Sequence, residues 1–167
     1  MLVFVLLFVL VLVLVLVLLF VLGSGGTGGN DDKILVLSCM DYRYIDATVA
    51  HLQELRGHVF DYFVLAGASL GYNLSGGWDK VFEEHIDLAI QLHSITEIVV
   101  VDHSDCGMYR AEYGDEYNVR PLELHQSNIM RFIAVLRDKY PQLKFEGLLL
   151  QETSSSPDFT VVWKSGK

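Results

Sequence analysis

Two cysteines and one histidine have the residue types and the spacing of a metal site. The run CMDYR begins at Cys39, and the run HSDC begins at His103 and ends at Cys106. Two thiolates and one imidazole are a ligand set that a catalytic zinc site uses, with its fourth position left open for water. The residue types alone also fit two ordinary buried thiols or one disulfide. The sequence predicts an open metal site, with these two alternatives beside it.

Both runs follow strands of a predicted parallel sheet. Residues 34–37 are a continuous apolar run, which is typical of a strand buried on both faces. Residues 97–101 are a second β-rich run, and they end shortly before His103. Ligands gather at the carboxyl ends of parallel strands, because the connecting loops diverge there. We therefore expect Cys39 and His103 to lie at the same edge of the sheet.

The whole pattern predicts an α/β fold, with a central, mainly parallel β-sheet flanked by helices and preceded by an N-terminal hydrophobic segment. The strongest helix signal lies in 78–93, where apolar residues recur at helical spacing. A shorter helix is expected to begin at Asp46 and to end before Gly57, and a long helix is expected over 122–136. A loop is expected over 67–77, and irregular polar chain after residue 101. The expected strands are 34–37, 62–65, 97–101, 145–150 and 159–163.

The two runs together resemble the motifs of one enzyme family. The pattern CxDxR from Cys39, followed by HxxCG from His103, resembles the β-class carbonic anhydrases. The run DHSDCGM at 102–108 is similar to that of the small, Cab-like members. The resemblance covers roughly residues 33–150, including the order of strands and helices. It implies a β-carbonic anhydrase-like zinc domain over residues 33–167 that forms a homodimer or a higher homo-oligomer.

The resemblance implies a role for each motif residue. Cys39, His103 and Cys106 are implied to hold one zinc ion (Zn2+) per chain. Asp41 and Arg43 are implied to form a catalytic dyad, in which Asp41 orients the hydroxide on zinc and Arg43 holds Asp41 by a two-pronged salt bridge. An ordinary surface salt bridge at a strand end is the alternative for this pair.

The residues before Ala66 differ from the pattern of the β-class carbonic anhydrases. Val64 and Leu65 precede Ala66-Gly67, where many family members have Arg-Asn, and this difference puts the identity of the substrate in question.

Asp102 is a candidate acceptor for the ring N–H of a histidine ligand. A solvated loop carboxylate is an equal alternative for Asp102.

The activity implied by the resemblance is that of a zinc lyase, carbonic anhydrase (carbonate dehydratase), which reversibly hydrates carbon dioxide to bicarbonate. Zinc lowers the pKa of bound water from about 15.7 to near 7, so that hydroxide is available at neutral pH to attack the carbon. One alternative is a carbon disulfide or carbonyl sulfide hydrolase that uses the same zinc site. Another is a catalytically silent, membrane-tethered module that binds zinc.

Composition separates the N-terminus from the rest of the chain. Residues 1–22 are apolar without exception, and as a helix residues 2–22 would be roughly 32 Å long, enough to cross a bilayer. We expect 1–22 to be a single-pass transmembrane anchor and 23–32 to be a Gly-rich flexible linker. If the leader is instead an added segment, we expect a cytoplasmic protein. The net charge of the chain is −9, and its sequence contains no cluster of basic residues. Both features argue against nucleic acid as a partner.

Overall fold

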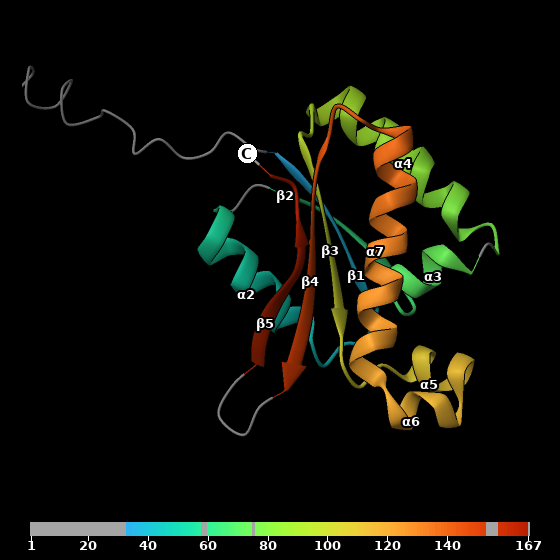
Figure 1. Cartoon of the computed structure of the whole chain (residues 1–167). Coiled ribbons are helices and arrows are strands. Elements are labelled where there is room, and N and C mark those ends of the chain that lie inside the picture. The colour runs from blue at the N-terminus through green and yellow to red at the C-terminus, as the bar shows by residue number, and fades with distance from the viewer. Residues whose placement is uncertain (1–32, 58–59, 75, 153–156, 167) are drawn as a thin grey trace, which may run out of the picture. The chain divides into compact units, whose positions relative to one another are not determined.

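A five-stranded β-sheet organises the part of the chain that the computed structural model describes, residues 33–57, 60–74, 76–152 and 157–166. The strand order is β2-β1-β3-β4-β5. Neighbouring strands are parallel except for β5, which is antiparallel to β4 (Figure 1). The strands are β1 (Ile34–Cys39), β2 (Phe60–Leu65), β3 (Glu97–His103), β4 (Lys144–Glu152) and β5 (Pro157–Lys164).

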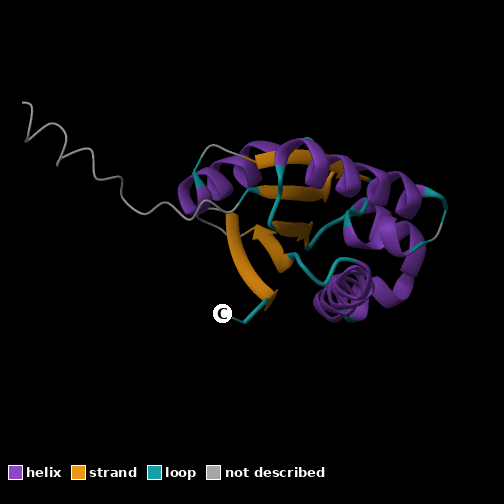
Figure 2. Ribbon diagram, turned by 90° about the horizontal axis from the view of Figure 1, so that it is seen from above, coloured by secondary structure: helices purple, strands orange, loops and turns teal. Residues whose placement is uncertain are grey.

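Helices cover both faces of this sheet. Helix α2 (Ile45–Arg56) packs on one face, and α4 (Trp78–His93) and α7 (Pro121–Lys139) pack on the other. Figure 2 shows the sheet and the helices on its two faces from above, with α7 viewed close to its axis. The predicted fold class, an α/β fold with a mainly parallel sheet between helices, is confirmed. Three short helices are α3 (Ser69–Asn73), α5 (Gly107–Tyr113) and α6 (Asp115–Val119).

The apolar run in β1 is explained by burial on both sides. Leu35 and Leu37 belong to the core cluster under α4 and α7, whereas Ile34 and Val36 belong to the cluster under α2. Successive side chains of a strand point to opposite faces of the sheet. A strand covered on both faces therefore needs apolar residues at every position, and the continuous run at 34–37 has this cause.

Some boundaries and two connections differ from the expectations. Helix α2 begins at Ile45, one residue before Asp46, and ends before Gly57 as expected. The expected loop 67–77 contains α3, and the expected irregular stretch after β3 contains α5 and α6. Helices of five to seven residues are too short to show a helical period. In α3, a Cβ atom on Gly71 would lie 2.4 Å from the carbonyl oxygen of Ala66, so glycine is what lets this helix pack against the end of β2.

The expected transmembrane segment, 1–22, and the expected linker, 23–32, lie outside the described residues. Within the described ranges, every helix is too short or too polar to span a bilayer.

Candidate metal centre

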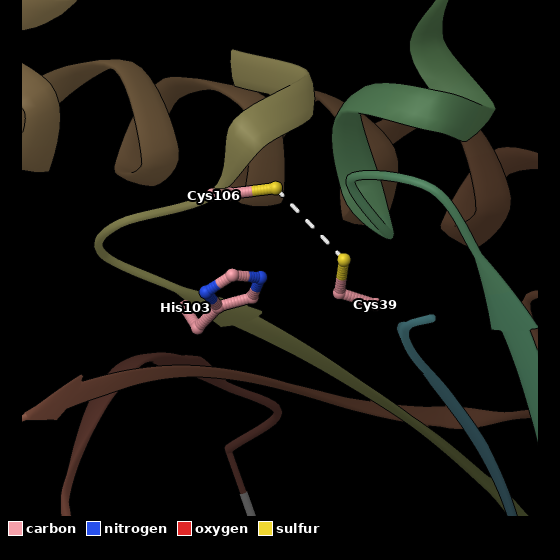
Figure 3. A group of neighbouring side chains, drawn as sticks. All are labelled: Cys39, His103 and Cys106. Atoms are coloured by element: carbon pink, nitrogen blue, oxygen red, sulfur yellow. Dashed lines mark hydrogen bonds between the residues drawn. The ribbon is translucent and has the colours of Figure 1, made fainter. Parts of the chain in front are cut away.

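Three ligand atoms converge at the carboxyl edge of the sheet (Figure 3). Cys39 is the last residue of β1, His103 is the last residue of the neighbouring strand β3, and Cys106 directly precedes α5. The two sulfurs and one ring nitrogen of His103 all lie within 4.8 Å of one another. In the described part of the chain, this is the one group of His, Cys, Asp and Glu side chains arranged to hold a metal ion. The structure thus brings together the three residues that the sequence singled out.

The separation of the two sulfurs fits a tetrahedral zinc ion. Zinc–sulfur bonds of about 2.3 Å at a tetrahedral angle place two thiolate sulfurs about 3.8 Å apart. The Sγ atoms of Cys39 and Cys106 are 3.8 Å apart. Both cysteines are free, and a disulfide would need a sulfur–sulfur distance of about 2.05 Å. The donor set therefore fits a zinc ion better than it fits a disulfide.

The ring of His103 is oriented with one nitrogen left for a ligand. Its Nδ1 lies 2.9 Å from Oδ1 of Asp105. An ionised carboxylate only accepts hydrogen bonds, so Nδ1 carries a hydrogen, and in the neutral ring that binds a metal Nε2 keeps the lone pair. This Nε2 atom is buried and has no hydrogen-bond partner among the described residues. A carboxylate that fixes the tautomer and a free Nε2 lone pair are what a metal-binding histidine needs.

The two thiols influence one another strongly. The pKa of Cys39 is well below its usual value, first because the Cys106 thiol donates a hydrogen bond to it. The same contact raises the pKa of Cys106. The amide of Gly67 also donates to Cys39 Sγ, at 3.4 Å. The contact therefore favours the thiolate form of Cys39 and the thiol form of Cys106, and a cation between the two sulfurs would favour both thiolates.

Asp41 and Arg43 form a two-pronged pair beside the three ligand atoms. Arg43 Nε donates to Asp41 Oδ1 at 3.0 Å, and Nη2 donates to Oδ2 at 2.6 Å. These hydrogen bonds lower the pKa of Asp41 below its usual range. Asp41 Oδ2 lies 3.9 Å from Nε2 of His103. The carboxylate is therefore ionised, paired with Arg43, and next to the space that a metal would occupy.

Asp105 and Tyr44 were not expected as parts of the site. Arg43 Nη1 donates to Asp105 Oδ2 at 2.7 Å, and the Tyr44 hydroxyl donates to Asp105 Oδ1 at 2.8 Å. Burial would raise the pKa of Asp105, but hydrogen bonds from His103, Tyr44 and Arg43 outweigh it and lower the pKa to about 2. Asp105 thus joins the histidine to the arginine. Its place in the HSDC run is the only sequence signal that could have indicated this.

Asp102 does not accept a hydrogen bond from the ring of His103. The two residues are adjacent in β3, so their side chains point to opposite faces of the sheet. The Asp102 carboxylate is buried instead against Ser69, Tyr109 and His125. Neither sequence interpretation of Asp102 is right, because it is neither an acceptor for His103 nor solvated.

A depression of about 360 Å³ opens over two of the ligand residues, Cys39 and Cys106. Apolar or small residues form much of its wall. Ala66 and Gly67, from the loop that departs from the family pattern, are among them. Residues lining the depression include Met40, Asp41, Arg43, Ala66, Gly67 and Met108.

The fold and the site together define a family of enzymes. A family model described as carbonic anhydrase matches residues 34–155. The chain belongs to the carbonic anhydrase family, and its fold is that of the β class. The family indicated by the CxDxR and HxxCG runs is thereby confirmed.

Two solved structures share the fold. One is a tetrameric β-carbonic anhydrase of the ascomycete Sordaria macrospora, with a TM-score of 0.50 and 17% sequence identity, covering 78% of this chain and 84% of that one. The other is the β-carbonic anhydrase CafA of Aspergillus fumigatus, with a TM-score of 0.52 and 14% identity, covering 80% of this chain and 77% of that one. At these identities the likeness concerns the fold alone.

Two bacterial proteins are more similar in sequence. An uncharacterized protein of Rickettsia conorii is 33% identical over 127 residues, covering 72% of this chain and 68% of that protein. An uncharacterized protein of Rickettsia bellii is 31% identical over 127 residues, covering 72% of this chain and 77% of that protein.

Proposed function

We propose that the protein is a zinc-dependent carbonic anhydrase that interconverts carbon dioxide and bicarbonate, with its chemical groups within residues 33–167. The observation that carries this proposal is the convergence of two thiols and the free Nε2 of His103 within 4.8 Å. Membership of the carbonic anhydrase family supports the same reaction.

In this proposal Cys39, His103 and Cys106 hold the zinc ion. A bound zinc ion supplies a nucleophile at neutral pH, because it lowers the pKa of water toward about 7. Asp105 keeps the hydrogen of His103 on Nδ1, which leaves Nε2 available as a ligand. The amide of Gly67 donates to the sulfur of Cys39 and stabilises its thiolate form.

Asp41 and Arg43 are proposed to orient the attacking group. The Asp41 carboxylate accepts a hydrogen bond from the attacking hydroxyl, which turns a lone pair of that oxygen toward the substrate carbon. Arg43 holds both carboxylate oxygens of Asp41, so the carboxylate keeps its direction. The apolar wall of the depression, with Met40, Ala66 and Met108, suits a small substrate that carries no charge.

Metal content and gas hydration of the purified chain test the proposal together. We expect close to one zinc ion per chain and rapid hydration of carbon dioxide in a stopped-flow assay with a pH indicator. A folded chain without metal would overturn the site. A zinc-loaded chain that hydrates no gas would instead be a silent zinc-binding module.

The apolar wall favours a second candidate, hydrolysis of carbon disulfide or carbonyl sulfide at the same site. Each sulfur compound can be offered in place of carbon dioxide, with release of hydrogen sulfide as the signal. Activity on the sulfur compounds alone would replace the first candidate with this one.

Replacing Asp105 with asparagine should weaken zinc binding. Asparagine keeps the shape but removes the charge that pairs with Arg43 and fixes His103. Loss of such a partner typically costs about 10- to 100-fold in metal affinity. The zinc dissociation constant, measured by competition with a chelating dye, should rise by this factor. Asp138→Asn, at an exposed position of α7, is the matched control, and equal affinities for the two variants would contradict the prediction.

We also propose that the protein forms a homo-oligomer. The Sordaria enzyme of the same fold is tetrameric. On this chain, helix α4 exposes Val81, Leu88 and Leu92 at helical spacing, and it lies beside β2, an edge strand of the sheet. Exposed apolar stripes of this kind mark protein–protein contacts, and an edge strand can pair with its own copy.

The double variant Leu88→Glu, Leu92→Glu should lower the mass of the particle to that of a monomer, because charges would enter the apolar contact. Light scattering after size-exclusion chromatography in a mild detergent measures the mass. Leu55→Glu, at an exposed position of α2, should leave the mass unchanged. A wild-type chain that is already monomeric would contradict the prediction.

A further inference from the structure

A second cluster of polar side chains lies behind the metal-ligand run, on the other face of β3. The Asp102 carboxylate accepts hydrogen bonds from the amide of Ser69 at 3.1 Å, from its hydroxyl at 2.7 Å, and from the Tyr109 hydroxyl at 2.6 Å. Nδ1 of His125 lies 3.2 Å from Oδ2 of Asp102. The side chains of His125 and Asp102 are 0% and 1% exposed. No role assigned so far uses this cluster.

Hydrogen bonds tie His125 to Asp102 on one side and to Tyr117 on the other. The Tyr117 hydroxyl donates its single hydrogen to the carbonyl oxygen of Ser104, at 2.5 Å, because a carbonyl can only accept. The oxygen of this hydroxyl also lies 3.2 Å from Nε2 of His125. Nδ1 on the other side of the ring faces the Asp102 carboxylate. The buried ring of His125 therefore joins Asp102 to Tyr117.

This hydrogen-bond network is connected to both sides of His103 in the chain. Asp102 directly precedes His103 in the chain, and the Tyr117 hydroxyl holds the carbonyl of Ser104, the residue that directly follows it. Cys106 packs in one buried cluster with Tyr109 and Tyr117. The path of the chain between the two ligands is thus held by Asp102, which points to the face of β3 opposite His103, and by Tyr117.

We propose that His125 is a positioning residue for the metal site, which links Asp102 to Tyr117 and so holds the run from His103 to Cys106 in its ligand geometry. Removing one member of a buried hydrogen-bond network leaves its partners without hydrogen bonds, which costs free energy and loosens their positions. Ligands held in place before the metal arrives lose less freedom on binding it. The inference rests on the proposed function only in taking zinc as the metal.

Two variants separate positioning from general stability. Tyr117→Phe keeps the ring in the core and removes the hydrogen bond to Ser104, while His125→Gln removes the ring that joins Asp102 to Tyr117. Each should raise the zinc dissociation constant by about 10- to 100-fold, as loss of an outer-shell partner does. The measurement uses the full chain in mild detergent and competition with a chelating dye. His93→Gln, at an exposed histidine of α4, is the matched control and should keep the wild-type affinity.

The double variant decides whether the two residues act through one connection. If they do, the zinc dissociation constant of the double variant, His125→Gln with Tyr117→Phe, should be about that of the weaker-binding single variant. It should not rise by the product of the two single-variant factors. Fully multiplicative effects, or wild-type affinity in Tyr117→Phe, would overturn the inference.

The contact between His125 and Asp102 can be observed without any variant. Nitrogen-15 NMR of the wild-type chain should show a hydrogen on Nδ1 of His125, the nitrogen that faces the Asp102 carboxylate, and a bare Nδ1 would overturn the inference even if His125→Gln failed to fold. A wild-type chain that binds no zinc would overturn the proposed function, and the nitrogen spectrum would still decide whether His125 donates to Asp102.

Discussion

Replacing Cys106 with serine should abolish both zinc binding and carbon dioxide hydration. A serine hydroxyl does not ionise near neutral pH as a thiol does, so the variant would offer zinc one thiolate and one imidazole. Cys106 is 2% exposed, and Cys39, itself a ligand in this proposal, is the only other cysteine of the sequence. Metal analysis should fall from close to one zinc ion per chain to near zero, and stopped-flow hydration should fall to the uncatalysed rate.

The fold should survive this substitution. Serine differs from cysteine only in carrying oxygen in place of sulfur, so it leaves little empty space in the core. The circular dichroism spectrum of Cys106→Ser should therefore match that of the wild type. Val161→Ser, at an exposed position of β5, controls for the introduction of a hydroxyl and should keep both zinc and activity. Retention of zinc and hydration by Cys106→Ser would show that the site lies elsewhere.

Replacing Asp41 with asparagine should separate metal binding from catalysis. The variant should keep its zinc, because the three proposed ligands are untouched. Its kcat/KM for carbon dioxide should fall by roughly 10²-fold, the usual cost of losing the orientation of a reacting group. The physical cause is the pairing with Arg43: an asparagine amide would place N–H donors against the guanidinium of Arg43, and it lacks the charge that Arg43 holds.

Zinc content and stopped-flow hydration, measured on the same preparation, check this expectation. Asp138→Asn serves again as the exposed control. Hydration at the wild-type rate in Asp41→Asn would leave Asp41 as an ordinary salt-bridge partner of Arg43. Loss of zinc from the variant would instead make Asp41 a contributor to metal binding.

The sequence was sufficient to predict the sheet and the convergence at its edge. The apolar run at 34–37 indicated a strand buried on both faces, and β1 has core clusters on both sides. Cys39 and His103 both end strands of a parallel sheet, so their proximity follows from the topology. The short helices α3, α5 and α6 were missed because their form depends on contacts with other elements, such as the close approach of Gly71 to Ala66.

The supporting residues of the site could not be predicted in the same way. The sequence offers Asp102 as a partner of His103, but alternation along β3 sends the two side chains to opposite faces, and Asp105 takes that place. The contact between Asp105 and Arg43 depends on the path of two irregular loops. The link from His125 to Ser104 through Tyr117 depends on how α6 and α7 pack. Neither arrangement leaves a periodic signal in the sequence.

The double contact of Arg43 bears on how such a site can change during evolution. One guanidinium binds Asp41, which faces the depression, and Asp105, which orients His103. A mutation at Arg43 therefore changes the position of Asp41 and the position of Asp105 at the same time. No substitution of Arg43 alters one of these two contacts alone. Changes at these three positions are expected to be accepted only in combination, so related chains should vary at them together or not at all.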